Sequence, residues 1–328
     1  MKRAIVTAVG HYLPDKVLDN KHFESYLDTT HEWIMERSGI RERRIEENGA
    51  TSYMGARAAR QVLENRGIDA SELDLIVFAT VTPDMFFPNT AALVQKELGA
   101  QNCWGFDLNG ACSGFVYALS VGAQFIESGR HQKVLVIGAD KMSTILDYND
   151  RNTAILFGDG AGAVLLEASD NEDEGFIDFV HYIDGRGGEY LYMPGGGSLN
   201  PSSKETIDKN WHVVHQDGKQ VFKAAVVGMA DYAVKIMERN NLKSEDVAYL
   251  VPHQANMRIM TATADRMGLE HSKVMVNIDK FGNTTAATIP LCLYEYHTAG
   301  KLKKGDNLVL ASFGAGYTCG SSLLRWAI

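Results

Sequence analysis

The sequence predicts an α/β fold made of two similar halves. Short apolar runs rich in β-branched residues alternate with stretches of helical periodicity, which is typical of βαβ units and buried parallel sheets. Parts of the first half recur in the second half at one constant spacing. No low-complexity or linker segment separates the halves. We therefore expect them to pack against each other.

The expected strands are short and apolar, and the expected helices carry apolar residues on one face. Strands are predicted at residues 4–8, 74–79, 104–108, 133–138, 163–166, 176–180, 247–251, 274–278, 307–311 and 321–326. Helices are predicted at residues 51–65, 89–98, 113–128, 221–240, 257–267 and 285–297. The N-terminal segment looks weakly like a signal peptide, but its apolar stretch is short, so we interpret it as the first strand.

The internal repeat links two pairs of segments. Residues 61–68 resemble residues 235–242, and each segment is followed by a short acidic link and an apolar run. Residues 133–136 resemble residues 307–310, and the spacing within this pair equals that within the first. Any two βαβ units share some likeness, but two matches at one spacing favour duplication. We predict an N-terminal half at residues 1–171 and a C-terminal half at 172–328, packed face to face around one site.

Composition excludes several classes of function. The chain of 328 residues has 32 Lys and Arg against 41 Asp and Glu, a net charge of −9, which disfavours non-specific nucleic-acid binding. No apolar run approaches the ~18 residues of a membrane span. Four cysteines are too few for a disulfide framework, which favours a reducing, cytoplasmic location.

Cys112 is the first candidate for chemistry. It lies in the segment 109–115, where a predicted strand ends and a predicted helix begins. The positive end of the helix macrodipole favours a thiolate there, and the neighbouring small residues allow a substrate to approach. The alternative is a small buried side chain, which is the usual role of a free cysteine. Cys103, Cys292 and Cys319 lack this placement and are interpreted as packing residues.

His253 and Asn283 are candidates of the same kind, because each follows a predicted strand and precedes a predicted helix. Taken alone, His253 could be a structural histidine and Asn283 a turn or helix-capping residue. Together with Cys112 they fit nucleophilic acyl chemistry, with two donors for a thioester oxygen. The same three residue types also suggest a papain-like hydrolase. The α/β pattern and the duplication disfavour that alternative.

Three other segments are candidates for ligand binding. Residues 158–163 look like a dinucleotide-binding glycine loop, but a strand follows where such a loop requires a helix. The glycine-rich segment 314–320 could direct backbone N–H groups into a cleft. His212 and His215 lack further ligands at metal spacing, so no metal site is expected. They lie in a long excursion at residues 190–218, a kind of loop that is often functional.

Six motifs in order along the chain resemble β-ketoacyl-acyl-carrier-protein synthase III, a condensing-enzyme family of the thiolase superfamily. They are the segments 32–43, 111–115, 150–163, 251–256, 282–287 and 312–318. The resemblance implies a thiolase-like fold with layers in the order α-β-α-β-α. It also implies decarboxylative condensation of an acyl-CoA primer, with acetyl-CoA expected, with malonyl-acyl carrier protein. The products are 3-oxoacyl-carrier protein, CoA and CO2, and no cofactor or metal is needed.

The resemblance implies roles for the candidate residues. Cys112 takes the acyl group, and His253 and Asn283 hold the malonyl thioester and stabilise the enolate formed as CO2 leaves. The backbone N–H groups of Cys112 and Ala315 form the oxyanion hole. Ala315 stands where the family more often has glycine.

The resemblance also implies binding residues. Trp33 and Arg151 enclose the CoA adenine, and Arg37 lies near the CoA phosphates. Phe87 crosses the interface of a homodimer to close the partner's acyl pocket. Phe313 lies beside the catalytic cysteine.

An acidic acyl carrier protein is the implied partner, so a local basic patch is expected. Its candidates are Lys219, Lys223, Arg258 and Arg266, although Asp265 falls where the family often has a basic residue. The excursion 190–218 is expected on the rim of the acyl channel, and primer length and branching stay open. The alternatives are a thiolase-superfamily acyltransferase or condensing enzyme of secondary metabolism, and a catalytically silent scaffold that binds the carrier protein.

Overall fold

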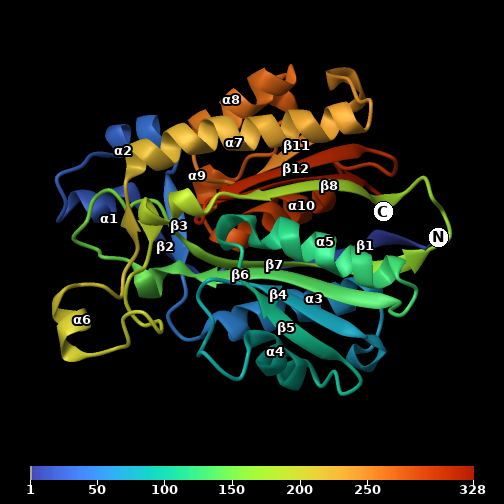
Figure 1. The fold of residues 1–328 in the computed structure, drawn as a ribbon, viewed down its shortest axis with the longest axis horizontal. Helices are drawn as coiled ribbons and strands as arrows, with labels where there is room; N and C mark the ends of the chain where they lie inside the picture. The colour runs from blue at the N-terminus through green and yellow to red at the C-terminus, as the bar shows by residue number, and fades with distance from the viewer. Residues whose placement is uncertain (1) are drawn as a thin grey trace.

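The structure is a computed structural model that describes residues 2–328. Figure 1 shows five layers, in which two β-sheets alternate with three layers of helices. This arrangement confirms the predicted thiolase-like α-β-α-β-α architecture. No helix within the described part of the chain combines the length and the apolar character needed to cross a bilayer.

The first sheet contains strands from the first half of the chain. Its order is β1 (Arg3–Tyr12), β7 (Asp159–Ser169), β6 (Lys133–Lys141), β4 (Leu75–Ala79) and β5 (Trp104–Leu108). β4 pairs in parallel with both β5 and β6, whereas β7 pairs antiparallel with β6 and β1. The sheet is therefore mixed. The prediction of parallel sheets was right for β4, β5 and β6 and wrong for β1 and β7. β7 follows β6 in the sequence without an intervening α-helix and therefore returns antiparallel to it.

The second sheet repeats this plan with strands from the second half. Its order is β11 (Tyr249–Pro252), β12 (Asn307–Gly314), β13 (Thr318–Arg325) and β8 (Gly175–Ile183). β11 and β12 are parallel, and the other two pairs are antiparallel. β11 begins as far after β4 in the sequence as β12 begins after β6, which is the spacing of the sequence repeat. The repeated topology confirms the duplication, while the domain boundary at 171/172 stays a prediction.

The predicted strand at residues 274–278 was wrong. Val274 makes one isolated parallel bridge to Leu250, and the short helix α9 (Ile278–Phe281) follows. The Oε1 atom of Gln254 accepts the backbone N–H groups of Asn277 and Ile278, and its amide group donates to Met275. A side-chain amide thus takes the hydrogen bonds that a neighbouring strand would have made.

Six long helices form the three helical layers, and all six were predicted to within a few residues. In Figure 1, α3 and α4 cover the outer face of the first sheet, α5 and α10 lie between the sheets, and α7 and α8 cover the second sheet. Their bounds are α3 Thr51–Arg66, α4 Thr90–Leu98, α5 Gly114–Glu127, α7 Gly218–Arg239, α8 Met257–Met267 and α10 Thr288–Thr298.

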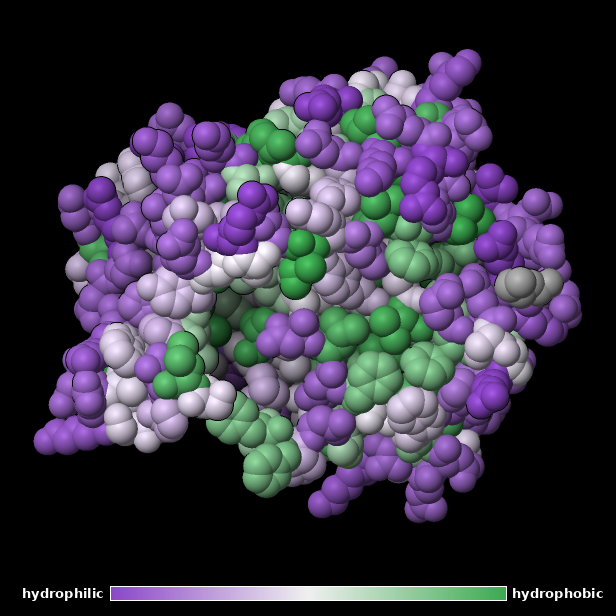
Figure 2. Space-filling view, viewed as in Figure 1, coloured by the Kyte–Doolittle hydropathy of each residue, from purple (hydrophilic) through white to green (hydrophobic). Residues whose placement is uncertain are grey.

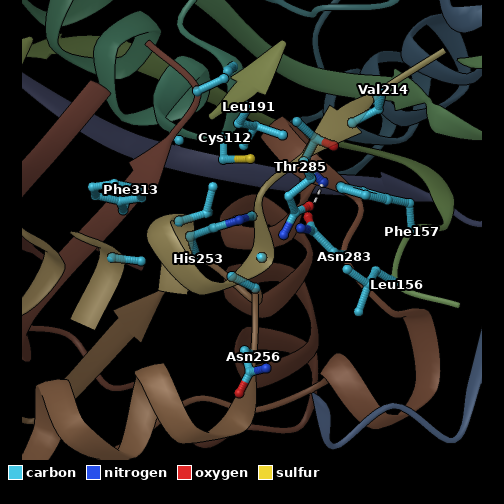
Figure 3. Close-up of a pocket in the computed structure, with 18 of the residues that line it drawn as sticks. Cys112, Leu156, Phe157, Leu191, Val214, His253, Asn256, Asn283, Thr285 and Phe313 are labelled. Atoms are coloured by element: carbon cyan, nitrogen blue, oxygen red, sulfur yellow. Dashed lines mark hydrogen bonds between the residues drawn. The ribbon is translucent and has the colours of Figure 1, made fainter. Parts of the chain in front are cut away.

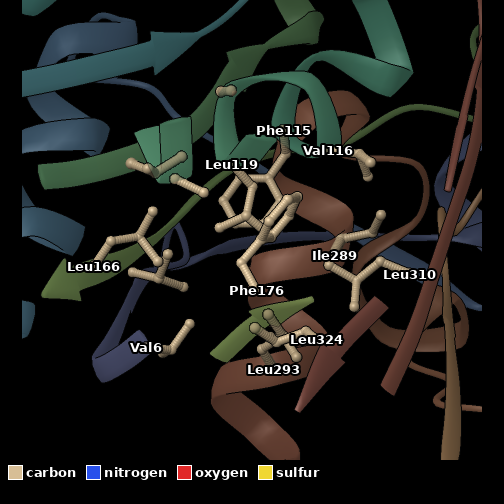
Figure 4. Packing of buried hydrophobic residues seen from close by; sticks show 14 of the residues in the cluster. Val6, Phe115, Val116, Leu119, Leu166, Phe176, Ile289, Leu293, Leu310 and Leu324 are labelled. Carbon is tan, nitrogen blue, oxygen red and sulfur yellow. The ribbon is translucent and has the colours of Figure 1, made fainter. Parts of the chain in front are cut away.

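The core between the sheets holds the two halves together. Figure 4 shows apolar side chains from both halves in one cluster. Phe115 and Leu119 of α5 pack with Ile289 and Leu293 of α10, and Phe176 of β8 joins them. All five are nearly inaccessible to solvent, so their burial contributes about 1.5–3 kcal/mol for each side chain. This packing fixes the ends of α5 and α10 that lead to the site.

Several short elements were not predicted, because they are too short and too polar to show periodicity. Near the N-terminus, β2 (Lys16–Asp19) pairs with β3 (Glu42–Ile45), and α1 (Asn20–Glu24) and α2 (His31–Ser38) lie between them in sequence. The excursion 190–218 contains three further short elements. They are β9 Leu191–Tyr192, α6 Lys204–Asp208 and β10 His215–Gln216, and β9 pairs with β10.

Candidate active site

A cavity of about 1220 Å³ contains the three candidate residues for chemistry. Cys112, His253 and Asn283 all line it, although Cys112 comes from the first half of the chain and the other two come from the second. Figure 3 shows the cysteine sulfur, the imidazole ring and the carboxamide turned toward the same space. The cavity opens on the face shown in Figure 2, which is hollowed beside the α6 loop.

Cys112 lies at the N-terminal end of the central helix α5. A single 3₁₀ turn at Ala111–Ser113 joins β5 to this helix, and Ala111 has a φ of 48°. This left-handed residue turns the chain sharply, so that the thiol projects into the cavity. The side chain is buried, with a relative exposure of 9%. The predicted placement at a strand-to-helix junction is confirmed.

The predicted preference for a thiolate is not what burial produces. Desolvation, joined by the nearby Asp140 carboxylate, raises the pKa of the Cys112 thiol to about 12. Burial disfavours the charged form more strongly than the helix N-terminus favours it. The resting thiol is therefore neutral, and the proton must leave when an acyl donor reacts.

His253 follows strand β11 and is held by two hydrogen bonds. Its backbone N–H donates to the carbonyl of Ala311 at 2.8 Å, and its Nδ1 atom lies 2.8 Å from the hydroxyl of Thr288. Burial lowers the pKa of this histidine to about 3, so the ring is neutral at physiological pH. A neutral imidazole carries one proton and can donate from only one nitrogen.

Asn283 lies in the loop between α9 and the 3₁₀ turn Thr285–Ala287. Its backbone bonds both ways with the segment around Leu156 and Gly158. Its side-chain oxygen accepts the backbone N–H of Thr285 at 2.9 Å, the bond drawn in Figure 3. The carboxamide is thereby oriented, and its NH₂ group is left to donate to a molecule in the cavity.

The C-terminal glycine-rich segment lies directly against Cys112. A Cβ atom on Gly314 would lie only 2.7 Å from the backbone nitrogen of Cys112, so only glycine fits at this approach. Ala315, the next residue, lines the cavity. The structure thus brings Ala315 and Cys112 to the same end of the cavity, as two oxyanion donors require.

The residues predicted for CoA binding lie together at the mouth of the cavity. Trp33 and Arg37 on α2 line it, and the Arg37 guanidinium lies 5.5 Å from the centre of the Trp33 ring. The Arg151 guanidinium lies 5.2 Å from the same ring and is anchored on Asp28. An indole with two guanidinium groups is suited to an aromatic, anionic ligand.

The two predicted acyl-pocket residues are placed differently. Phe313 is buried in the cavity wall, and its ring packs on Tyr317 with the centroids 4.9 Å apart. Phe87 does not line the cavity of its own chain and is 85% exposed. Its proposed place in a partner's pocket therefore stays a prediction.

The basic residues predicted for the carrier protein form an incomplete patch. Lys219 and Arg258 lie at the rim of the cavity, and Lys223 lies one turn further along α7. Arg266, near the other end of α8, forms an ion pair with Asp231 at 3.1 Å. The structure therefore places two of the four at the cavity and leaves Arg266 with its charge already paired.

Several residues at the site were missed from the sequence. Asp140, near the end of β6, is fully buried, and its charge helps to raise the pKa of the Cys112 thiol. Asn256 lines the cavity and caps α8. The apolar wall comes from dispersed segments and has no motif; it includes Val81, Met142, Ile145, Phe157, Leu191 and Val214. The last two residues belong to the excursion, which accordingly contributes to the cavity.

The remaining motifs do not line the cavity. Residues 158–163 run directly into β7, as expected. His212 bonds to Thr206, and His215 bonds to the carbonyl of Asn210. No group of three or more His, Cys, Asp or Glu side chains in residues 2–328 is arranged to hold a metal. Cys103, Cys292 and Cys319 are free and buried, which confirms them as packing residues.

The doubled α/β architecture, with a buried cysteine, histidine and asparagine in one cavity between the halves, defines a thiolase-like condensing enzyme. Two family models match the chain: 3-oxoacyl-[acyl-carrier-protein] synthase III at residues 106–185, and the C-terminal part of the same family at residues 237–326.

Known proteins agree over the whole length. The β-ketoacyl-[acyl-carrier-protein] synthase III of Chlorobaculum tepidum is 60% identical over 327 residues, which is 99% of each chain. The crystal structure of 3-oxoacyl-[acyl-carrier-protein] synthase III from Aquifex aeolicus is 40% identical, with a TM-score of 0.92 over 98% of this chain and 100% of that one. The priming β-ketosynthase of a polyketide pathway is 35% identical, with a TM-score of 0.91 over 99% and 96%. The chain belongs to the β-ketoacyl-[acyl-carrier-protein] synthase III family, which confirms the resemblance.

Proposed function

We propose that the protein condenses an acyl-CoA primer with malonyl-acyl carrier protein, releasing CoA and CO2 and forming 3-oxoacyl-carrier protein. The observation that carries this proposal is the convergence of Cys112, His253 and Asn283 on one cavity. One nucleophile and two neutral hydrogen-bond donors are what a two-step acyl transfer through an enzyme-bound thioester requires. The scheme uses only these side chains and the two substrates.

In the first step the sulfur of Cys112 attacks the acyl-CoA carbonyl. The carbon–sulfur bond to CoA breaks, the thiol proton passes to the departing CoA sulfur, and acyl-Cys112 remains. In this scheme the tetrahedral oxyanion is held by the backbone N–H groups of Cys112 and Ala315. The close approach of Gly314 to the Cys112 nitrogen supports this assignment, because Gly314 immediately precedes Ala315. Since the thiol is neutral at rest, transfer of its proton accompanies the attack.

In the second step malonyl-carrier protein replaces CoA. The malonyl thioester oxygen accepts hydrogen bonds from His253 and Asn283, the bond to the carboxylate breaks, and CO2 leaves. The electron pair forms an enolate that the two donors stabilise. Its carbon attacks the acyl-Cys112 carbonyl, and the Cys112 sulfur leaves as a thiolate. The thiolate then takes a proton from water, which replaces the proton that left with CoA in the first step. Neutral His253 is suited to this role because it donates a hydrogen bond without a positive charge. A positive charge would stabilise the malonyl carboxylate and oppose the loss of CO2.

Residues at the mouth of the cavity are suited to bind CoA and the acyl carrier protein. Trp33 and the Arg151 guanidinium would stack on the adenine, and the Arg37 guanidinium would pair with phosphate. Lys219 and Arg258 at the rim would attract an acidic carrier protein locally. Because the net charge of the chain is −9, long-range attraction would not help, and the patch must act at short range.

We also propose a cytoplasmic homodimer, with free cysteines supporting the compartment. β5 is an edge strand, paired only with β4 among the described strands, and its Trp104 is 49% exposed. Phe86 and Phe87 are 80% and 85% exposed on a nearby loop. Figure 2 shows apolar side chains gathered on the face that carries α5 and β5. Such an edge and patch are typical of an interface.

The test uses purified full-length protein, radiolabelled acetyl-CoA and malonyl-carrier protein. We expect label on the protein, its loss in Cys112→Ser, and 3-oxoacyl-carrier protein by mass spectrometry. Cys292→Ser is the matched control, because that thiol is buried away from the cavity. Label that still attaches to Cys112→Ser, or the absence of any 3-oxoacyl product, would contradict the proposal.

A second candidate is a priming condensing enzyme of a specialised pathway. The observation that favours it is the 35% identity to the polyketide priming β-ketosynthase over almost the whole chain. Both functions use the same chemistry and differ in primer. A panel of straight and branched acyl-CoA primers, with the product masses measured by mass spectrometry, distinguishes the two functions. Preference for acetyl-CoA supports the initiating condensing enzyme, and rejection of acetyl-CoA supports the priming enzyme of a specialised pathway.

A further inference from the structure

We propose that Thr288 is a positioning residue for the condensation step. Its hydroxyl donates to Nδ1 of His253 and thereby keeps the single proton of the neutral imidazole on Nε2, where it can be given to the malonyl thioester. The inference rests on the proposed function and names a group, outside the cysteine, histidine and asparagine, that sets which nitrogen donates.

The contacts of His253 leave few choices. Its side chain is 1% exposed, and its Nδ1 lies 2.8 Å from the Thr288 hydroxyl. Among the described residues no other side-chain hydrogen bond is made by this imidazole, so Nε2 is left for a ligand. Because the ring is buried and neutral, it does not acquire a second proton that would make both nitrogens donors. Whether the Thr288 hydroxyl donates to Nδ1 or accepts from it therefore decides the tautomer.

The Thr288 hydroxyl has one proton and two acceptors within reach. Its oxygen lies 2.8 Å from Nδ1 and 3.0 Å from the carbonyl oxygen of Thr285. If the proton goes to the Thr285 carbonyl, Nδ1 must donate to the hydroxyl, and Nε2 presents a lone pair to the thioester oxygen. If it goes to Nδ1, Nε2 keeps its hydrogen. Only the second arrangement stabilises an enolate oxygen.

The same short turn orients the second donor. Thr285 has a φ of 53°, which is unfavourable for a β-branched residue. This conformation lets its backbone N–H bond the Asn283 oxygen while its carbonyl lies beside Thr288. One strained residue thus joins the network that orients both donors, which is where strain of this kind is retained.

The experiment compares Thr288→Val with Thr288→Ser in the two half-reactions. Valine keeps the shape and removes the hydroxyl. We expect condensation and malonyl-carrier-protein decarboxylation to fall about 100-fold, similar to loss of one oxyanion donor. Transfer of acetyl from CoA to Cys112 should change less than about twofold, because it does not use the Nε2 proton. Thr288→Ser should restore both reactions.

Thr263→Val is the matched control. Thr263 is equally buried on α8, bonds its own helix through its hydroxyl and does not line the cavity. Both half-reactions should survive this change. Undiminished condensation in Thr288→Val, or equal loss of both half-reactions, would overturn the inference.

A spectroscopic arm separates this inference from the proposed function. In protein with ¹⁵N-labelled histidine, His253 is assigned by comparison with His253→Ala. We expect the wild-type signal of the Nε2–H tautomer, and a shift toward the other tautomer in Thr288→Val. Failure of the wild type to condense would refute the proposed function, while the tautomer shift would still be measured. An Nδ1–H tautomer in the wild type would refute the role of Thr288.

Discussion

The Asp140 carboxylate accepts the backbone N–H of Ala286 at 3.1 Å, a contact between the two halves of the chain. Its other oxygen accepts four bonds from Thr80, Val81 and Thr82. Gly138, two residues earlier, allows this contact, since a Cβ atom there would lie 2.4 Å from the Ala286 oxygen. One buried carboxylate therefore links β6 and the loop after β4 to the 3₁₀ turn that follows Asn283.

Asp140→Asn should lower the free energy of unfolding by about 1–3 kcal/mol. Asparagine replaces one carboxylate oxygen by an NH₂ group, which cannot accept the hydrogen bonds that this oxygen receives. Urea denaturation measures the free energy of unfolding, with Asp170→Asn on the surface as the control.

Asp140→Asn should also speed alkylation of Cys112 at pH 8, because the Asp140 charge raises the pKa of the thiol. Burial raises the pKa of Asp140 to about 6, so the two proteins should converge below that pH. An unchanged free energy of unfolding in Asp140→Asn would contradict the structural role of this carboxylate.

The reactivity of Cys112 toward iodoacetamide should rise with pH across the whole accessible range. With the thiol pKa raised to about 12 by burial, the thiolate fraction grows about tenfold per pH unit below it. Mass spectrometry of the modified peptide between pH 7 and 9 measures the slope. A plateau beginning near pH 7 would show a thiolate already formed in the free enzyme.

His253 should stay neutral from pH 8 down to pH 5, because burial lowers its pKa to about 3. Its ¹⁵N ring signals should not move over this range, whereas free histidine added as an internal reference titrates at about pH 6.5. Titration of the His253 signal with a midpoint above 5 would contradict the lowered pKa, and a midpoint above 7 would mean that the ring is charged at neutral pH.

Trp33→Ala should raise the KM for acetyl-CoA about tenfold and leave kcat nearly unchanged. Loss of a stacking surface for one base costs about 1–3 kcal/mol and does not touch the reacting atoms. Acetyl-pantetheine, which has no adenine, is the control substrate and should be used equally well by both proteins. An equal loss with both substrates would place Trp33 outside the nucleotide site.

Trp104→Glu should convert the proposed dimer to a monomer. A charge on the exposed β5 edge would oppose pairing of this strand with a second copy. Sedimentation velocity of the wild type and the variant gives the answer, with Tyr26→Glu, on the exposed surface near α1, as the control. A wild-type protein that sediments as a monomer would refute the dimer.

The sequence was informative where chemistry and periodicity coincide. Cys112 and His253 could be placed because each follows a strand of the βαβ pattern, whereas Asn283 was placed by the helix that follows it. The neutral thiol could not be predicted, because burial depends on packing between segments distant in sequence. Asp140 and Thr288 carried no signal for the same reason. Each is a common residue type in its position, and the partner that gives it a role, Ala286 for Asp140 and His253 for Thr288, is distant in sequence. The strand expected at 274–278 failed because the amide of Gln254 takes its hydrogen bonds.

The β9–β10 ribbon closes the excursion at its base. Tyr192 pairs with His215, and the Asp217 N–H donates to the Tyr190 carbonyl at 2.8 Å. Beyond this neck the chain forms an appendage that includes α6, with Leu199 88% exposed. The cavity wall is therefore anchored independently of the tip. The tip becomes a natural graft position, where an affinity tag or fluorophore could report on the rim while the catalytic chamber keeps its shape.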